Sequence, residues 1–157
     1  MNTTNEQLIT TFYKAFQQKD YATMQQCYAE NAIFNDEAFK NLNATQVRAM
    51  WQMLISRGKD LEISFKNIES EGNKATAEWI ATYTFSQTKR KVVNHIKANF
   101  VIENGKIITH TDQFNFYKWS RQSLGLVGYV LGWTGFLRKK VSETAMKSLS
   151  DFMAKKG

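Results

Sequence analysis

Two side chains able to transfer protons, His110 and Asp112, lie two positions apart in an alternating stretch of the sequence. Because successive side chains of a β-strand point to opposite faces, residues at this spacing share one face. An imidazole beside a carboxylate can carry out general acid–base chemistry. The two backbone positions lie roughly 6 to 7 Å apart along a strand, so the side chains must lean together to touch.

The direction in which this pair points decides its chemistry. We expect a final strand from about Ile107 to Tyr117, with two faces of different polarity. The face that carries the pair also carries three apolar residues, Ile108, Phe114 and Phe116. The opposite face carries Ile107, Thr109, Thr111, Gln113, Asn115 and Tyr117. The first face is more apolar at both ends, so we expect it to face inward.

The Asn104-Gly105 dipeptide before that strand predicts a β-hairpin, whose loop length sets the register. A two-residue loop would place both titratable side chains on the polar side. A three-residue loop from Glu103 to Gly105, with the glycine left-handed, pairs Ala98 with His110 instead. We choose the three-residue loop because it alone matches the apolar faces of both strands.

A carboxylate in an apolar interior must find partners, remain hydrated or take up a proton. Two interpretations of the pair stay open: His110 and Asp112 satisfy each other as a structural pair, or they form the polar base of a ligand cavity. In the second interpretation aromatic side chains wall the cavity, namely Trp51, Trp79, Tyr83 and Phe114.

Helical periodicity in the first third of the chain is followed by period-two alternation. We expect helices behind a Thr3-x-x-Glu6 capping box, after the cap Asp20 through Tyr28, and from Asn43 or Thr45 to Gly58. A strand-like stretch, 32–36, separates the last two helices. Alternation over 61–117 predicts consecutive hairpins. This order predicts an α+β domain with helices packed on one face of an antiparallel sheet.

The net charge of +7 invites a nucleic-acid interpretation, but the basic residues are mostly scattered and no recognition motif accompanies them. The single cysteine, Cys27, lies on a helical apolar stripe and excludes an intrachain disulfide. No signal peptide is recognisable at the start of the sequence. We therefore expect a cytoplasmic protein with no nucleic-acid partner.

The residues after Trp119 differ in character from the rest. The run from Leu124 to Leu137 is apolar, contains four glycines and is shorter than the ~20 residues of a spanning helix. A helix over 137–154 has one apolar stripe, formed by Val141, Ala145, Leu149 and Phe152. We expect this tail to pack on the same domain and to make no membrane contact. The rival is docking of the basic helix to a membrane surface or a partner.

Several stretches resemble the nuclear transport factor 2-like superfamily, and its SnoaL-like branch in particular. They are Phe12-Tyr13-Lys14-Ala15-Phe16, Gln18-Lys19-Asp20-Tyr21, Tyr28-Ala29-Glu30-Asn31-Ala32-Ile33-Phe34 and Asn104-Gly105-Lys106-Ile107. The resemblance implies a cone-shaped barrel over 1–117, commonly a homodimer, with a small-molecule pocket between helices and sheet. Residues 118–157 extend beyond the minimal family domain and resemble tails of bacterial members.

The resemblance also suggests roles for individual residues. Asp36 matches the general base of ketosteroid isomerases of this fold, and Phe12 and Ala98 match their two oxyanion-hole donors. Neither Phe12 nor Ala98 can donate a hydrogen bond, which argues against that reaction. Asp112 matches the last-strand aspartate of SnoaL-like polyketide cyclases and limonene epoxide hydrolases. The arginine and second aspartate that surround it in the hydrolases are not recognisable here.

Two main functions remain open from the sequence. The first is an isomerase, cyclase or hydrolase acting on a hydrophobic small molecule, with Asp112 as acid or base, His110 as its partner and Asp36 as a second titratable group. The second is a non-catalytic binding or assembly domain that uses the same pocket. We expect no metal, because His95 and His110 should face opposite sides, and no phosphate-binding cofactor, because no suitable Gly-rich loop is present.

Overall fold

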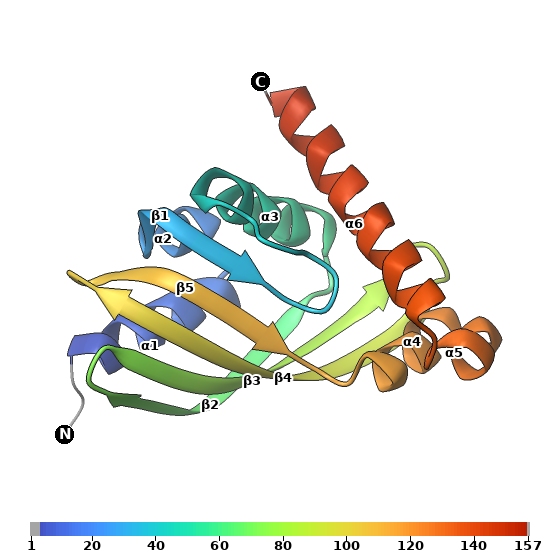
Figure 1. Ribbon diagram of the computed structural model, residues 1–157, viewed down its shortest axis with the longest axis horizontal. Helices are drawn as coiled ribbons and strands as arrows, with labels where there is room; N and C mark the ends of the chain where they lie inside the picture. Colours follow the sequence, from blue (N-terminus) through green and yellow to red (C-terminus); the bar gives the residue numbers. More distant parts are fainter. Residues whose placement is uncertain (1–3, 157) are drawn as a thin grey trace.

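In the computed structural model, which describes residues 4–156, five strands form one curved sheet in the order β1-β5-β4-β3-β2 (Figure 1). The strands are β1 (Tyr28–Asn35), β2 (Glu62–Glu71), β3 (Lys74–Phe85), β4 (Arg90–Glu103) and β5 (Lys106–Gln113). Strands β2 to β5 are antiparallel neighbours, and β1 joins the edge parallel to β5. The predicted α+β class and its consecutive hairpins are confirmed.

Six helices accompany the sheet within the described residues: α1 (Thr4–Gln17), α2 (Tyr21–Gln26), α3 (Ala44–Arg57), α4 (Phe116–Leu124), α5 (Leu126–Leu131) and α6 (Gly135–Lys156). Two predicted caps are confirmed. Asp20 accepts a hydrogen bond from the Thr23 amide, and Asn43 forms a capping box with Gln46. Such caps satisfy amides that the first helical turn leaves unpaired. The Thr3 cap lies outside the described residues.

The core lies between the first three helices and the concave face of the sheet. Along β3 and β4 the inward positions alternate small and large side chains, as in Ala77 beside Trp79 and Ala98 beside Phe100. The alanines leave space that aromatic rings from α1 fill, including Phe12 and Phe16. Interdigitation of this kind produces the packing density of a protein interior.

The hairpin between β4 and β5 differs from the sequence prediction. Glu103 pairs with Lys106, so the loop has two residues, Asn104 and Gly105, both with positive φ. Positive φ at both loop positions is characteristic of the type I′ turn that Asn-Gly favours. The predicted three-residue loop is therefore wrong.

A bulge in β5 nevertheless turns the titratable pair inward. The register shifts between Val101 and Ile102, after which Phe100 pairs with His110 and Ala98 with Asp112. The extra residue of a bulge reverses the face on which later side chains lie. The predicted cross-strand partner of His110 is wrong, but the predicted inward direction of both side chains is correct.

The predicted end of the last strand is also wrong. Strand β5 stops at Gln113, and Asn115 accepts a hydrogen bond from the Lys118 amide to cap α4. The side-chain cap gives the backbone an alternative to the sheet ladder, which asparagine favours. Phe116 and Tyr117, predicted in the strand, instead open this helix. The neighbouring edge strand, β1, begins at Tyr28, earlier than the predicted strand.

Helix α6 crosses the outer side of α3 at one end of the molecule (Figure 1). Its predicted stripe supplies the contact, and Leu149 is only 1% exposed. Arg138 pairs with Glu37 at 2.7 Å, and the Ser142 hydroxyl donates to the Ala38 carbonyl. The last helix therefore holds the loop that follows β1.

Helices α4 and α5 pack closely through glycine. A Cβ atom on Gly128 would lie 2.0 Å from the Ser120 carbonyl oxygen, and one on Gly132 would lie 2.2 Å from the Ser120 hydroxyl. No other residue type fits so close a contact. In the apolar segment the glycine side is buried, while large apolar side chains remain exposed.

The convex face of the sheet is polar. It carries Ser64, Lys66, Glu78, His95 and Lys97, which line a hollow of about 320 Å³. His95 is thus on the face opposite buried His110, as its strand parity predicts. The homodimer expected from the family resemblance stays a prediction.

Leu149→Ala should lower the free energy of unfolding by about 2–4 kcal/mol, because it opens a cavity where α6 meets the core. Leu126→Ala makes the same chemical change at a side chain that is 80% exposed, and should stay within about 0.5 kcal/mol. Urea unfolding of both variants checks the pair. Equal losses in both would show that α6 does not stabilise the core.

Candidate functional site

A chain of hydrogen bonds crosses the interior between three elements. Trp51 Nε1, from α3, donates to the Tyr28 hydroxyl at 2.8 Å. The hydroxyl, from β1, lies 2.8 Å from His110 Nδ1, and His110 Nε2 lies 2.9 Å from Asp112 Oδ1. His110 is completely buried and Asp112 is 3% exposed. The predicted pair is therefore in direct contact, with two further residues extending it.

The order of donors assigns the histidine tautomer. Because the Tyr28 hydroxyl already accepts from Trp51, its own hydrogen is free to be donated to His110 Nδ1. The Nε2–H group then donates to the Asp112 carboxylate. Every hydrogen along the chain has an acceptor in this arrangement. Hydrogen bonds linked in this way polarise and strengthen one another in a low-dielectric interior.

Aromatic rings enclose the imidazole on several sides. Its ring centroid lies 4.3 Å from that of Phe100 and 4.9 Å from that of Phe34. The rings of Phe12 and Trp51 lie at 5.7 and 6.2 Å. These contacts exclude water from the pair, so its hydrogen bonds are not weakened by solvent competition.

Asp112 has one oxygen that its neighbours leave available. Both hydrogen bonds that the described residues give it, from His110 and at 3.5 Å from Trp79 Nε1, reach Oδ1. Its cross-strand partner is Ala98, whose methyl group offers the carboxylate no hydrogen bond. An oxygen with free lone pairs at this point could accept a proton from a ligand, which requires direct contact.

Tyr13 adds a polar group that sequence reasoning missed. Its hydroxyl is buried and has no hydrogen-bond partner within the described chain. Burial, together with the charge of Asp112, holds the pKa of Tyr13 well above its usual value, so the hydroxyl keeps its proton. A buried donor without an acceptor is costly, and a ligand oxygen would satisfy it.

Asp36 lies where β1 enters the loop beneath α6. Its Oδ1 accepts from the amides of Ala38 at 2.7 Å and Phe39 at 2.6 Å. Loss of hydration outweighs these two bonds and raises the pKa of the Asp36 carboxyl to about 7, with a smaller contribution from the charge of Asp112. The residue is partly exposed, so this carboxyl can exchange protons with water near neutral pH.

The predicted cavity walls fall into two groups. Trp51, Trp79, Phe12 and Ala98 lie around the His110–Asp112 pair. Tyr83 and Phe114 pack against the main core and also against a second cluster, here termed the mouth cluster, which is formed by Val92, Phe116, Trp119 and Leu137. Trp119 Nε1 donates to the Tyr83 hydroxyl at 2.8 Å. Burial raises the pKa of Tyr83, with a smaller contribution from the charge of Asp36. The mouth cluster thus closes the end of the cone at which Asp36 lies.

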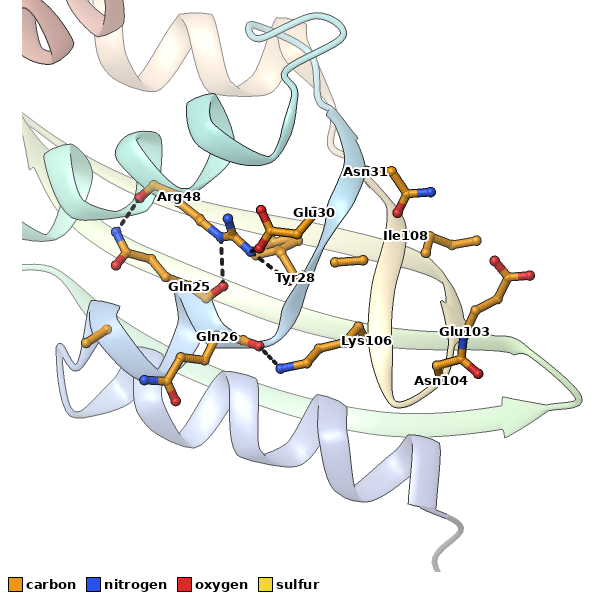
Figure 2. A pocket seen from close by; sticks show the side chains of 12 residues that line it. Gln25, Gln26, Tyr28, Glu30, Asn31, Arg48, Glu103, Asn104, Lys106 and Ile108 are labelled. Atoms are coloured by element: carbon orange, nitrogen blue, oxygen red, sulfur yellow. Dashed lines mark hydrogen bonds and ion pairs between the residues drawn. The ribbon is translucent and has the colours of Figure 1, made fainter.

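One hollow lies outside the cone. A groove of about 590 Å³ runs beside α2, β1 and the β4–β5 hairpin (Figure 2). Its two cations are already engaged, since Arg48 donates to the Tyr28 carbonyl and pairs with Glu30, and Lys106 donates to the Gln26 carbonyl. Neither this groove nor the convex hollow is lined by His110 or Asp112.

Other chemistries find little support in the part of the chain that the structure describes. Among these residues, no cluster of three histidine, cysteine or acidic side chains could hold a metal ion. Burial raises the pKa of the Cys27 thiol to about 11, so the nucleophilic thiolate is scarce. None of the described helices is long and apolar enough to cross a membrane.

A family model described as SnoaL-like domain matches residues 9–110. The chain belongs to the SnoaL-like family. The match covers α1 to most of β5 and ends at His110, so it contains the Trp51–Tyr28–His110 part of the hydrogen-bond chain. The resemblance noted in the sequence is thereby confirmed. No curated protein matches this chain.

Solved structures share the fold of this SnoaL-like domain. An epoxide hydrolase from M. tuberculosis described as LEH-like has a TM-score of 0.66 at 18% identity, covering 82% of this chain and 96% of its own. TsrD from Streptomyces laurentii has a TM-score of 0.67 at 20% identity, covering 80% and 99%. TerC, co-crystallised with polyporic acid, has a TM-score of 0.65 at 9% identity, covering 76% and 98%. Identities this low establish the fold alone.

In this SnoaL-like domain, the sequence periodicity assigns one site residue, Tyr28, to the wrong secondary-structure element. The helical pattern places it in the second helix, but it opens β1, where its side chain points inward. The sequence signal that could have identified Tyr28 as a site residue is a tyrosine at the first inward position of an edge strand. Tyr13 carries a weaker signal, because a helix places it next to Phe12 on the buried side.

Tyr28→Phe should lower the free energy of unfolding by about 1–3 kcal/mol, because Trp51 Nε1 and His110 Nδ1 both lose their partner. Tyr13→Phe is a matched control. It deletes a hydroxyl that has no partner among the described residues, so it should cost nothing or stabilise. Chemical denaturation of both variants tests the contrast, and equal losses would contradict the hydrogen-bond chain.

The raised pKa of Asp36 predicts a pH dependence of stability. Between its ordinary value of 3.8 and about 7, the folded protein retains a proton that the unfolded chain has released. The contribution of Asp36 to stability is therefore present at low pH and is lost as pH rises through about 7. Relative to wild type, Asp36→Asn should gain about 2–4 kcal/mol of stability between pH 4 and pH 8, at 1.36 kcal/mol per pKa unit less an allowance for partial exposure.

Denaturant titrations at several pH values measure this difference. Asp60→Asn is the control, because hydrogen bonds from Thr84 lower the pKa of Asp60, so this carboxyl causes no loss of stability as pH rises. An Asp36→Asn difference that stays constant from pH 4 to pH 8 would contradict the raised pKa.

Proposed function

We propose that this SnoaL-like domain binds a hydrophobic small molecule inside its cone and carries out acid–base chemistry on it. Asp112 is the proton acceptor or donor, His110 its hydrogen-bonding partner, and Asp36 a second titratable group at the mouth. The reaction class is isomerase, cyclase or hydrolase. No cofactor is part of the proposal.

The observation that carries the proposal is the buried hydrogen-bond chain from Trp51 to Asp112. Taking a carboxylate and an imidazole out of water costs free energy, and apolar side chains of similar volume commonly give equal or greater stability. Perturbed titratable groups gathered in an apolar site are typical of functional sites. Burial raises the pKa of both Tyr13 and Asp36, and the charge of Asp112 adds to the rise in each.

The proton can be followed through the proposed site. Asp112 Oδ2 takes a proton from a ligand carbon, hydroxyl or water, and the His110 Nε2–H group stays hydrogen-bonded to Oδ1 throughout. The Tyr13 hydroxyl donates a hydrogen bond to the oxygen on which negative charge develops. The Asp112 proton then returns to another atom of the ligand, which completes an isomerisation or ring closure without a net change in charge.

The mouth cluster supplies the entrance in this proposal. Trp119 and Phe116, from α4, and Leu137, from α6, pack against Tyr83 and Phe114 beside Asp36. Movement of these helices would expose the inner rings, and lids that open and close are common where water must be excluded. The C-terminal extension then controls access to the pair.

A second candidate is a binding or assembly domain without catalysis. The observation that favours it is the closed interior, since rings fill the space around His110 and neither hollow touches Asp112. In that case the pair is a structural element that fixes the packing of β1, α3 and β5. The two candidates differ in whether the Asp112 charge affects ligand binding and turnover or only the stability of the fold.

Asp112→Asn separates these candidates. Asparagine keeps an acceptor oxygen for His110 Nε2–H, so unfolding should stay within about 1 kcal/mol of wild type. Turnover or binding in a panel of epoxides, cyclic ketones and polyketide-like phenols should fall by about 100-fold or more. Asp151→Asn, at an exposed ion pair on α6, is the control and should change neither quantity.

Two results would defeat the catalytic proposal. One is an unfolding loss of several kcal/mol in Asp112→Asn, as for a broken structural pair. The other is unchanged binding and turnover of every compound that wild type accepts. Asp36→Asn should lower turnover or ligand binding less than Asp112→Asn does, because Asp36 Oδ1 is already engaged by backbone amides.

A further inference from the structure

The C-terminal extension carries a large exposed apolar surface. Leu126 is 80% exposed, Trp133 74% and Phe136 70%. Together with Val127, Tyr129, Val130 and Leu131 they form what we term the α5 patch. Seven exposed large apolar side chains within eleven consecutive positions are a concentration of apolar surface of the kind that marks an interaction site.

The patch results from the way in which α5 is held. Gly128 and Gly132 lie one helical turn apart and face Ser120 of α4 at backbone distance. Because the side of α5 without side chains is buried, its apolar side chains must point away from the protein. The Trp133 indole donates to the Val130 carbonyl within the same segment, which fixes the ring on this outer side.

The surroundings of the patch are strongly basic. From Gln113 to Ser142 the sequence has no acidic residue, whereas Lys118, Arg121, Arg138, Lys139 and Lys140 are all cationic. Glu37 pairs with Arg138, and Arg121 lies over the rings of Tyr117 and Tyr129. The three lysines of this stretch are exposed.

A second basic stretch reaches the same end of the molecule. The β3–β4 hairpin tip carries Lys89, Arg90 and Lys91, and the chain has no acidic residue between Glu78 and Glu103. Arg90 Nε donates to the Gln122 carbonyl of α4, and the Thr88 hydroxyl donates to the Ser123 carbonyl. The tip therefore lies beside α4 and α5 (Figure 1).

In place of the expectation that the tail makes no membrane contact, we propose that the α5 patch docks on the surface of an anionic lipid bilayer, with its apolar side chains in the interfacial region and the surrounding lysines and arginines facing lipid phosphates. An apolar face with aromatic residues, bordered by cations, is the arrangement that interfacial membrane segments use. Tryptophan and tyrosine favour the headgroup level, where Trp133 and Tyr129 would lie. Since no described helix can cross a membrane, the segment lies in the plane of the surface.

The charge of this surface argues against a second copy of the chain as the occupant. A two-fold contact through the patch would bring two sets of exposed lysines together, and like charges facing one another oppose association. An anionic bilayer offers the opposite sign to both basic stretches. This proposal does not depend on the proposed catalytic function.

Flotation of the full chain with phosphatidylcholine vesicles, with and without about a third phosphatidylglycerol, tests the docking. The wild-type protein should bind the anionic vesicles and should not bind the neutral ones. High salt should release it from the anionic vesicles. The tryptophan emission should shift to the blue on binding, because Trp133 is the one exposed tryptophan among the four of the chain. Trp133→Phe should abolish the shift while binding persists.

Two double variants separate the apolar and the charge contributions. Trp133→Ala/Phe136→Ala should weaken binding by about tenfold or more, and Lys139→Gln/Lys140→Gln should weaken it by a similar factor. Ile33→Ala/Leu54→Ala and Lys66→Gln/Lys97→Gln make matched changes elsewhere on the surface and should bind as wild type does. All of these side chains are at least partly exposed, so thermal unfolding should change little.

Three outcomes would overturn the proposal. The first is no binding to anionic vesicles. The second is equal binding to neutral and anionic vesicles, which would remove the electrostatic contribution. The third is a concentration-dependent dimer in light scattering that Trp133→Ala/Phe136→Ala dissociates, because the patch would then be covered by a second copy.

Discussion

A carboxylate and an imidazole in contact inside an aromatic interior dictate how the elements around them must be arranged. Burying such a pair is costly unless every polar atom is satisfied. Four elements together supply partners for the imidazole and for one carboxylate oxygen: β5 carries His110 and Asp112, β1 carries Tyr28, α3 carries Trp51, and β3 carries Trp79. A displacement of any one of them would leave a buried donor or acceptor unpaired. The hydrogen-bond chain therefore links the curvature of the sheet to the position of the third helix.

The C-terminal extension has two sides with different surroundings. On one side, α4 and α6 complete the mouth cluster and hold the loop that carries Asp36. On the other, glycine packing between α4 and α5 leaves apolar side chains facing outward in a basic surrounding. The same forty residues thus both cover the end of the cone and provide a surface for docking. Family membership accounts for the cone, since the match ends at His110 and the extension lies beyond it.

Much of the fold could be predicted from patterns along the chain. Caps at Asp20 and Asn43 and the stripe of α6 are local signals, and each is confirmed. The predictions that were wrong concern the register and the end of β5, each of which depends on two local features acting together. An Asn-Gly turn of two residues and a bulge near Ile107 act together on β5, and each alone would have given the opposite face. Likewise, the end of β5 depended on competition between strand pairing and the Asn115 cap.

Periodicity and charge are local properties, and they were enough to establish the fold class, the inward direction of His110 and Asp112, and the strongly basic character of the tail. The partners of the pair depend on tertiary structure instead. Tyr28 and Trp51 are far from His110 along the chain and meet it because β1 pairs in parallel with β5 beneath α3. Tertiary structure also selects which side of the glycine-rich segment is buried, since that depends on how closely two backbones approach at Ser120. Contacts of this kind depend on the relative position of whole elements, which no window of sequence contains.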